Sequence, residues 1–517
     1  MSTDPLSTRS LEQAKKAAKR LRKALAQAEP DAVDRFIAVF RDRKDPATAN
    51  HSDCLHVIAR EAGAESWPRL KIAVETATLD REARVVALER AVANGNFWMM
   101  DRLLSLEPGL ADAHFGLQLA LVREGEALTA LDRNPGLAMT PIGRRWPIHH
   151  LCFSKLHQHQ PGRVPDMISL LDALLVAGAD LNQGYPAEPG SDHMLSPLYG
   201  ALGHAQNLPL ARTLLERGAD PNDNESLYHA TELDDLEGVR LLFAHGAEIG
   251  TTNAFFRMLD KENADGLRLF LANGADPNGP VYQHPSDQPA DERNALHHAI
   301  FRGRSGEIGA ILLEHGVDTS ARYDGRTPYG LAVACGNHSM AAMLEARGLA
   351  TPLNDAERFL AAIGRLDGEE ALRLLAAKPS LLRELTEKDL ARPTDLAISA
   401  ENLPVLKLMA DLGFDPNRKG EGDTPPIHAA AWWGHADIVE MYLGFGVELE
   451  SLNMYGGTAL GTTIHGSANC PGRDRGDYVR CVELLLNAGA KIRLDDGDLE
   501  MGSEEVTLIL EDWMEHA

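Results

Sequence analysis

The chain has 517 residues, which is long for one compact core, yet no linker-like Pro/Gly/Ser tract divides it. Its 76 Asp and Glu residues outnumber 51 Lys and Arg, giving a net charge of -25. A field of that sign repels phosphate backbones, so nucleic acid is excluded as an expected partner and a protein or peptide with a basic segment is favoured.

Cysteine usage and hydropathy indicate the compartment. The five cysteines are scattered, odd in number and form no Cys-x-x-Cys pair, which favours reduced thiols. The first ten residues are polar, and no apolar run approaches the length of a membrane-spanning helix. We expect a soluble, cytoplasmic protein with no membrane contact.

A small helical domain is predicted over residues 1–79. Ser10 and Gln13 form a capping box for a first amphipathic helix. Its apolar stripe consists of Leu11, Ala14, Ala18, Leu21, Leu25 and Ala28. The opposite face is basic, which indicates either a solvated surface or a contact site for an acidic surface. Further helices are expected to begin at Pro30, near Ser52 and after Ser66.

A short pattern close to Gly-Ala-Asp-Pro-Asn returns along the rest of the chain. Its clearest copies start at Gly178, Gly218, Gly274 and Gly413. Each follows an apolar pair, and several are preceded by a Pro-Leu-His-like start. Self-similarity with a period of about 33 residues is typical of stacked helical repeats, in which no unit buries its own apolar face.

The repeats predict an all-α solenoid over residues 80–493. Some units end in a Pro-x-Leu variant, at Pro108, Pro135 and Pro379. Counting these, we expect about twelve helix pairs, several of them degenerate. Residues 494–517 are expected to form an acidic loop and a C-terminal capping helix. The apolar face of that helix consists of Val506, Ile509, Leu510 and Trp513.

These motifs resemble the ankyrin repeat, and the best copy runs from Asp423 to Glu450. Its matching elements are Pro426-Ile427-His428, Ala430-Ala431, Gly434-His435 and Tyr442-Leu443 with Gly446. Pro425 departs from the family pattern, because it replaces the usual Thr. The stretch from Ser52 to Lys71 resembles the helical lead-in of many bacterial ankyrin proteins.

The resemblance implies two antiparallel helices per unit, a projecting β-hairpin-like finger and a concave groove with a binding role. It supplies no catalytic residues. We therefore expect a scaffold that recognises a protein or peptide partner through its groove and has no enzymatic activity.

Exposed aromatic residues at groove positions are candidate binding residues. Trp432 and Trp433 end a first helix, and Trp is strongly enriched at binding hot spots. Packing against the adjacent repeat is the structural alternative. The next finger and the next first helix add Leu452, Met454, Tyr455 and His465.

Other candidate binding residues lie outside this repeat. Phe301 and Arg302 are included, together with Tyr185 and Tyr282 in two lengthened fingers, 183–195 and 279–293. Long inserts in regular repeats are often on the binding face.

The histidines predict no metal or other cofactor. His149, His297 and His428 occupy the Pro-Leu-His position, where a ring nitrogen stabilises the turn. The extra His157 and His159 match no zinc spacing.

An alternative enzymatic reading centres on an inserted loop within residues 466–478. His465, Cys470 and Asp474 lie close in sequence and could supply a nucleophile and a base. Closeness in sequence is weak support, because catalytic groups normally converge from distant elements. The alternative therefore stays open here.

Overall fold

The computed structural model describes residues 11–49, 51–233, 235–279, 293–419, 424–492 and 502–516. Within these ranges the named elements are helices, apart from one antiparallel strand pair, β1 (Tyr185–Pro186) and β2 (Met194–Leu195). This pair forms the hairpin of the first lengthened finger. The predicted all-α solenoid is confirmed. The Ser10 cap and Tyr282 lie outside the described residues.

The chain divides into two compact units. The first comprises residues 1–276 and 280–291, and the second comprises residues 277–279 and 292–517.

The first unit begins with four helices. They are α1 (Leu11–Ala26), α2 (Pro30–Phe40), α3 (His51–Glu61) and α4 (Trp67–Thr78). Apolar residues three and four apart on α1 are buried, as the stripe predicts, and α1 packs on α3. The stripe ends before Ala28, which is exposed and has a φ of 52° outside the helix. Ser66 caps α4 as predicted, because its hydroxyl accepts the N–H of Arg69.

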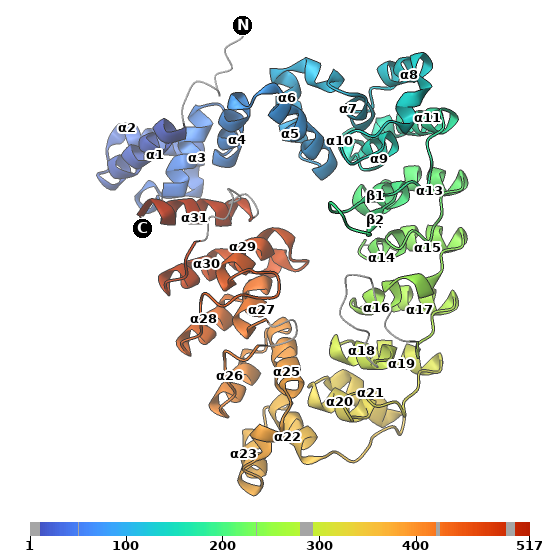
Figure 1. Cartoon of the computed structure of the whole chain (residues 1–517). Coiled ribbons are helices and arrows are strands. Elements are labelled where there is room, and N and C mark those ends of the chain that lie inside the picture. Colours follow the sequence, from blue (N-terminus) through green and yellow to red (C-terminus); the bar gives the residue numbers. More distant parts are fainter. Residues whose placement is uncertain are drawn as a thin grey trace. The chain divides into compact units, whose positions relative to one another are not determined.

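The rest of the first unit consists of helix pairs (Figure 1). The pairs are α5 (Arg81–Asn94) with α6 (Phe97–Leu106), α7 (Phe115–Ala120) with α8 (Glu124–Arg133), α9 (Pro147–Cys152) with α11 (Val164–Val176), α12 (Pro197–Tyr199) with α13 (Leu208–Glu216), α14 (Ser226–Ala230) with α15 (Glu237–Ala244), and α16 (Ala254–Leu259) with α17 (Ala264–Ala272). A short helix, α10 (Leu156–His159), lies between α9 and α11, and a π-turn, η6 (Gly200–His204), extends α12.

The second unit also consists of helix pairs. Its pairs are α18 (Ala295–Phe301) with α19 (Gly306–Glu314), α20 (Pro328–Ala334) with α21 (His338–Ala346), α22 (Asp355–Gly364) with α23 (Gly368–Ala377), α25 (Glu387–Ser399) with α26 (Leu403–Asp411), α27 (Pro426–Trp433) with α28 (Ala436–Gly444), and α29 (Ala459–Asn469) with α30 (Tyr478–Asn487). A short α24 (Leu381–Glu384) precedes α25, and α31 (Glu504–His516) ends the unit.

The repeated Gly-Ala-Asp-Pro-Asn motif has a direct structural role in joining units. Its glycine takes the left-handed conformation after the second helix, as Gly178 does with a φ of 100°. The following Asp then closes a local turn, and the Asn side chain accepts a backbone N–H from the next finger. Such links are Asn182 to Asp220 (2.9 Å), Asn222 to Glu248 (2.7 Å), Asn278 to Asp318 (2.6 Å) and Asn417 to Glu448 (3.0 Å). The motif therefore fastens one finger to the next.

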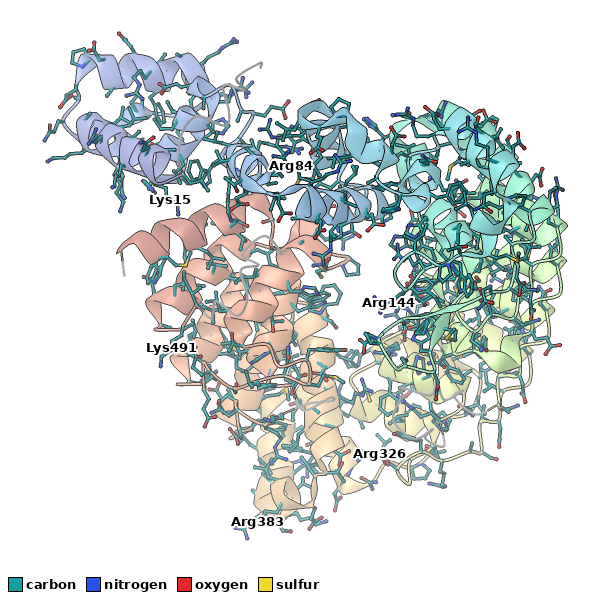
Figure 2. All side chains as sticks on the ribbon, turned by 45° about the horizontal axis from the view of Figure 1, so that its top comes forward. Lys15, Arg84, Arg144, Arg326, Arg383 and Lys491 are labelled. Carbon is teal, nitrogen blue, oxygen red and sulfur yellow. The ribbon has the colours of Figure 1, made fainter. Side chains whose placement is uncertain are left out.

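Helix α25 departs from the regular repeat. It has 13 residues, compared with 7 in α18, and begins at a capping box between Thr386 and Asp389. Arg326, labelled in Figure 2, lies in the turn before α20 and makes an ion pair with Asp389. The same guanidinium is 3.7 Å from the carboxylate of Glu357 on α22. The helix is thereby tied to two earlier repeats.

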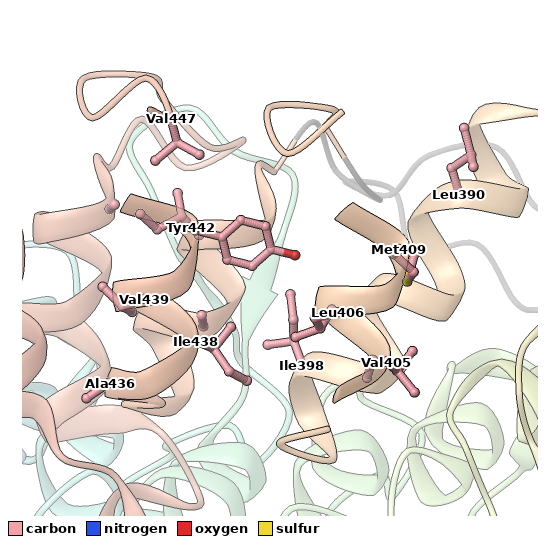
Figure 3. Close-up of a cluster of buried hydrophobic side chains, with 14 of the residues drawn as sticks. Leu390, Ile398, Val405, Leu406, Met409, Ala436, Ile438, Val439, Tyr442 and Val447 are labelled. Atoms are coloured by element: carbon pink, nitrogen blue, oxygen red, sulfur yellow. The ribbon is translucent and has the colours of Figure 1, made fainter. Parts of the chain in front are cut away.

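One hydrophobic core runs through the second half of this unit. Ile398 of α25 and Leu406 of α26 face Ile438 and Tyr442 of α28 (Figure 3). The core continues to α31, where Val506 and Leu510 are fully buried and Ile509 and Trp513 pack against it. The C-terminal helix therefore covers the last repeat, as its apolar face predicts.

Candidate functional site

The predicted groove residues of the second unit lie on α27, α29 and the finger between α28 and α29. We call Trp432, Trp433, His465, Leu452, Met454 and Tyr455 the aromatic strip. Helices α27 and α29 pack side by side. His428 and Trp432 are one turn apart on α27, so they lie on the same face of the helix. Thr462 and His465 are related in the same way on α29.

His428 connects the finger to this face. Its ring nitrogens lie 3.5 Å from the hydroxyl of Ser451 and 3.4 Å from that of Thr462. Burial lowers the pKa of His428 to about 4, so the ring is neutral at physiological pH. These contacts join α27 to the finger and the first helix of the next repeat.

Trp432 is half-buried and held from two sides. Its ring stacks on His465 with centroids 5.7 Å apart, and its carbonyl accepts a hydrogen bond from the Tyr478 hydroxyl at 2.8 Å. A Cβ added at Gly466 would lie 2.6 Å from that carbonyl oxygen, so α29 can approach only because this residue is Gly. The side chain as a whole remains partly exposed.

Trp433 is also half-buried, but its contacts are with the inserted loop. It stacks on His435 at 6.4 Å, and a Cβ added at Gly472 would lie 3.1 Å from its ring. The N–H of Asp477 donates to the carbonyl of Gly434 at 2.8 Å and closes the loop. Trp433 therefore anchors the loop, which is the packing role weighed above for one of the two tryptophans.

The inserted loop is shorter than the sequence suggested. Residues 467–469 continue α29, because the Ser467 hydroxyl donates to the Ile464 carbonyl and Cys470 N–H donates to Gly466. The loop proper begins at Cys470.

The finger between α28 and α29 presents three apolar side chains to water. The side chain of Asn453 accepts the N–H groups of Tyr455 and Gly457 and so shapes a tight turn. Tyr455 is 85% exposed, Met454 is 59% exposed, and Leu452 is also exposed. Through Asn453, whose amide donates to Thr462 at 3.1 Å, the finger is joined to α29.

The three residues of the enzymatic alternative occupy different environments. Cys470 is fully buried, and burial together with its hydrogen bond to Tyr478 raises the pKa of that phenol. His465 is exposed and lies 3.2 Å from the Asn469 amide, while Asp474 is exposed in the loop. Among the described residues, no hydrogen bond or ion pair joins His465, Cys470 and Asp474.

Two other predicted binding residues are interior. Tyr185 is 3% exposed, because β1 folds its ring against His149 at 4.8 Å and Phe153 at 5.6 Å. Phe301 is 5% exposed and packs edge-on against Tyr323. Tyr185 was predicted from the length of its finger, and an insert's length does not show that the finger folds its ring inward. Arg302, next to Phe301, is exposed.

A charged network in the first unit was not predicted. The carboxylate of Glu225 lies between His193 and His229, and His229 also meets Glu232 at 2.7 Å. Burial alone would lower the pKa of His229, but its hydrogen bonds to the two carboxylates outweigh this effect and raise the pKa to about 9. Glu225, His229 and Glu232 lie three and four residues apart in one repeat, so helical spacing could have identified them, whereas His193 comes from the preceding finger and has no local signature. In the described part of the chain, no three His, Cys, Asp or Glu side chains are placed to hold a metal ion.

Comparisons with known proteins identify the repeats. One family model for ankyrin repeats, of three copies, matches residues 256–353, and a second, of many copies, matches residues 395–460. No helix in the described ranges has both the length and the apolar character needed to cross a membrane.

Two individual proteins are similar over part of the chain. The probable E3 ubiquitin-protein ligase XBOS33 of Oryza sativa subsp. japonica is 30% identical over 157 residues, covering 28% of this chain and 28% of that protein. The chain therefore matches little more than a quarter of that relative. The crystal structure of the human ASB11 ankyrin repeat domain matches 46% of this chain and 99% of its own, with 19% identity and a TM-score of 0.21.

The helix pairs, the linked fingers and the matched segments point to the same architecture. Ankyrin repeats are protein-interaction modules, and this assigns the chain a protein-binding role in general terms. Residues 256–353 and 395–460 are therefore ankyrin repeats.

Proposed function

We propose that the aromatic strip binds a protein or peptide segment and that the chain acts as a non-catalytic scaffold. The observation that carries the proposal is that Leu452, Met454 and Tyr455 are exposed on the finger that Asn453 joins to α29, the helix whose exposed His465 stacks on the half-buried Trp432. Apolar groups gathered in this way are costly to leave in water, and aromatic residues dominate binding hot spots.

The preferred partner segment is basic. The support is the net charge of -25, which attracts cationic segments over distances of about a Debye length, ~8 Å at physiological salt. Arg473 and Arg475 lie in the inserted loop, so the attraction comes from the surrounding surface and not from the loop. Binding is expected to weaken as salt concentration rises.

We also propose that the chain has no catalytic activity. A nucleophile must reach its substrate, whereas Cys470 is buried against Tyr478, and Asp474 lies in solvent. A cytoplasmic location is proposed as well, supported by five free and buried cysteines.

Site-specific photo-crosslinking in the native cell tests the proposal. A photoreactive phenylalanine analogue at Met454 should capture a discrete protein, and Trp432→Ala in the same chain should abolish that product. Leu372 is the matched control position, because it is equally exposed at 59% on another repeat of the same unit. Equal crosslinking at positions 372 and 454, or a product insensitive to Trp432→Ala, would place the binding surface elsewhere.

A further inference from the structure

An open hollow rich in arginine lies in the first unit, between α2 and α3. Its volume is about 560 Å³, within the range of about 300–1,000 Å³ typical of small-molecule sites. It is lined by α2, by η1 (Arg41–Arg43), a single 3-10 turn that follows α2, and by the end of α3. Four of the lining residues are arginines, and we call the site the arginine hollow. They are Arg35, Arg41, Arg43 and Arg60.

Most of the positive charge in the arginine hollow has no protein partner. Glu61 is the one carboxylate among the described lining residues, and Arg35 already holds both of its oxygens, at 2.7 and 2.8 Å. Arg41, Arg43 and Arg60 are exposed, and within the described ranges their guanidinium groups make no ion pair or hydrogen bond. Three like charges around one hollow repel one another, and a bound anion would relieve that repulsion.

The backbone at Arg41 is in a conformation that arginine rarely adopts. Its φ is 54°, in the left-handed region that favours glycine. The chain meets the same need just after α3 with Gly63, whose φ is 88°. Strained residues of this kind cluster at binding and catalytic sites. The strain at Arg41 therefore supports a functional role for its guanidinium.

The lining and the charge pattern define the chemistry of the ligand. Ala38 and Val39 are the only apolar residues described in the lining, so the ligand needs no large apolar body. Guanidinium groups bind phosphate through paired N–H···O hydrogen bonds, and three of them suit a ligand with several phosphate oxygens. Residues 1–79 contain 14 Lys and Arg against 11 Asp and Glu, whereas residues 80–517 contain 37 against 65. Because the rest of the chain repels anions, a compact polyanion is favoured over a long nucleic acid.

We propose that the arginine hollow binds a compact polyanion with two or more phosphate groups, held by Arg41, Arg43 and Arg60. The site is independent of the aromatic strip, and it takes ligands of the opposite charge to the segment proposed there.

Isothermal titration calorimetry on the full chain tests the proposal with inorganic pyrophosphate as the probe. Citrate is the matched control, because it carries a similar negative charge at neutral pH but offers carboxylates in place of phosphates. Pyrophosphate should bind about tenfold more tightly than citrate, or better, at physiological ionic strength. Equal binding of the two would reduce the hollow to a non-specific charge effect and overturn the proposal.

Two further ligands identify the source of the phosphate groups. Vesicles of phosphatidylcholine with phosphatidylinositol 4,5-bisphosphate should co-sediment with the chain only if the source is a lipid headgroup, and pyrophosphate should then release them. Pyrophosphate binding without vesicle binding would identify a soluble polyphosphate, and either result supports the site. A short DNA duplex that binds more tightly than pyrophosphate would instead identify a nucleic-acid surface and overturn the proposal.

Variants locate the binding. Arg43→Gln with Arg60→Gln should weaken pyrophosphate binding about tenfold or more. The matched control Arg90→Gln with Arg133→Gln removes the same charge from exposed positions on later helices of the unit and should change it less than about twofold. Arg41→Gly removes the third guanidinium and suits the left-handed backbone, so it should weaken binding about threefold or more without lowering the melting temperature. Unchanged pyrophosphate affinity in either the double variant or Arg41→Gly would overturn the proposal.

Discussion

Phe301 and Trp432 hold the same position in their repeats but meet opposite surroundings. Each stands four residues after the slot histidine, His297 or His428, and two residues before a left-handed glycine. Phe301 is buried beneath Arg392, whereas Trp432 is partly exposed and stacks on His465. Phe301 is covered by Tyr323 of the following finger and by Arg392 of α25, an element that neither repeat contains.

The comparison teaches that repeat register alone does not determine exposure in this array. In a regular solenoid each unit contacts only its neighbours, so a groove position stays open. Here a lengthened helix covers Phe301 in one repeat, while Trp432 in a later repeat stays partly exposed.

Replacing Phe301 should produce the largest loss of stability. Phe301→Ala removes a buried ring that packs on Tyr323 and under Arg392, and is expected to cost about 3–5 kcal/mol. Tyr455→Ala, at an exposed finger tip, should change stability by less than about 0.5 kcal/mol. Urea denaturation of both variants measures the difference, and equal midpoints would show that α25 does not cover Phe301.

Removing Arg326 tests how α25 is held. Arg326→Met leaves the carboxylates of Asp389 and Glu357 buried without their cation, at a cost of about 3 kcal/mol. Arg347→Met, which breaks an exposed pair with Glu314, should cost less than about 1 kcal/mol. A loss for Arg326→Met no larger than for this control would contradict the anchoring of α25.

The open repeat should respond to acid through His428. Its pKa in the folded chain is about 4, below the ordinary value of 6.5, so the unfolded chain takes up the proton first. Stability conferred by the neutral ring is present above pH 6.5 and is lost as pH falls towards 4, by up to about 3 kcal/mol. Denaturation between pH 7 and 4 should therefore be less pH-dependent in His428→Gln. An identical pH profile in the two proteins would be inconsistent with a buried neutral ring.

Trp432→Ala should separate binding from folding. Because the ring is only half-buried, its loss is expected to cost about 1–2 kcal/mol of stability, less than Phe301→Ala. Affinity for the partner captured at position 454 should fall by about 2 kcal/mol or more. Unaltered affinity of the folded variant would identify Trp432 as a packing residue.

The smallest effects are expected in the inserted loop. His465→Ala and Asp474→Ala should each change partner affinity by less than about 1 kcal/mol, since contacts at a rim are individually weak. A turnover that falls about a hundredfold in either variant, with the melting temperature unmoved, would instead support the enzymatic alternative.

Local chemistry explains why much of the fold could be predicted. The α1 stripe, the Ser66 cap and the apolar face of α31 depend on residues three or four apart, and the structure bears them out. The Gly-Ala-Asp-Pro-Asn copies predicted the solenoid because each copy is a short contiguous motif that recurs along the chain. The division into residues 1–79, 80–493 and 494–517 stays a prediction.

The candidate sites were harder to predict because they depend on contacts between repeats. Trp432 and the exposed finger could be proposed from register, yet the burial of Phe301 depends on Arg392, far along the chain. The meeting of Glu225 with His193 likewise has no local signature. Contacts between side chains of different repeats leave no pattern in the sequence of a single repeat.

The contact between α25 and α18 also limits how the number of repeats can change during evolution. Arrays of neighbour-only repeats can gain or lose a whole unit and still stack. Between α18 and α25 a repeat cannot be removed without loss of contacts. Deleting α20, α21 and the preceding finger would separate Phe301 from Arg392 and would also remove Arg326, which pairs with Asp389. Residues 295–411 should therefore be kept as a block in descendants of this chain. Duplications and losses should instead collect where fingers join adjacent repeats, as Asn222 joins Glu248.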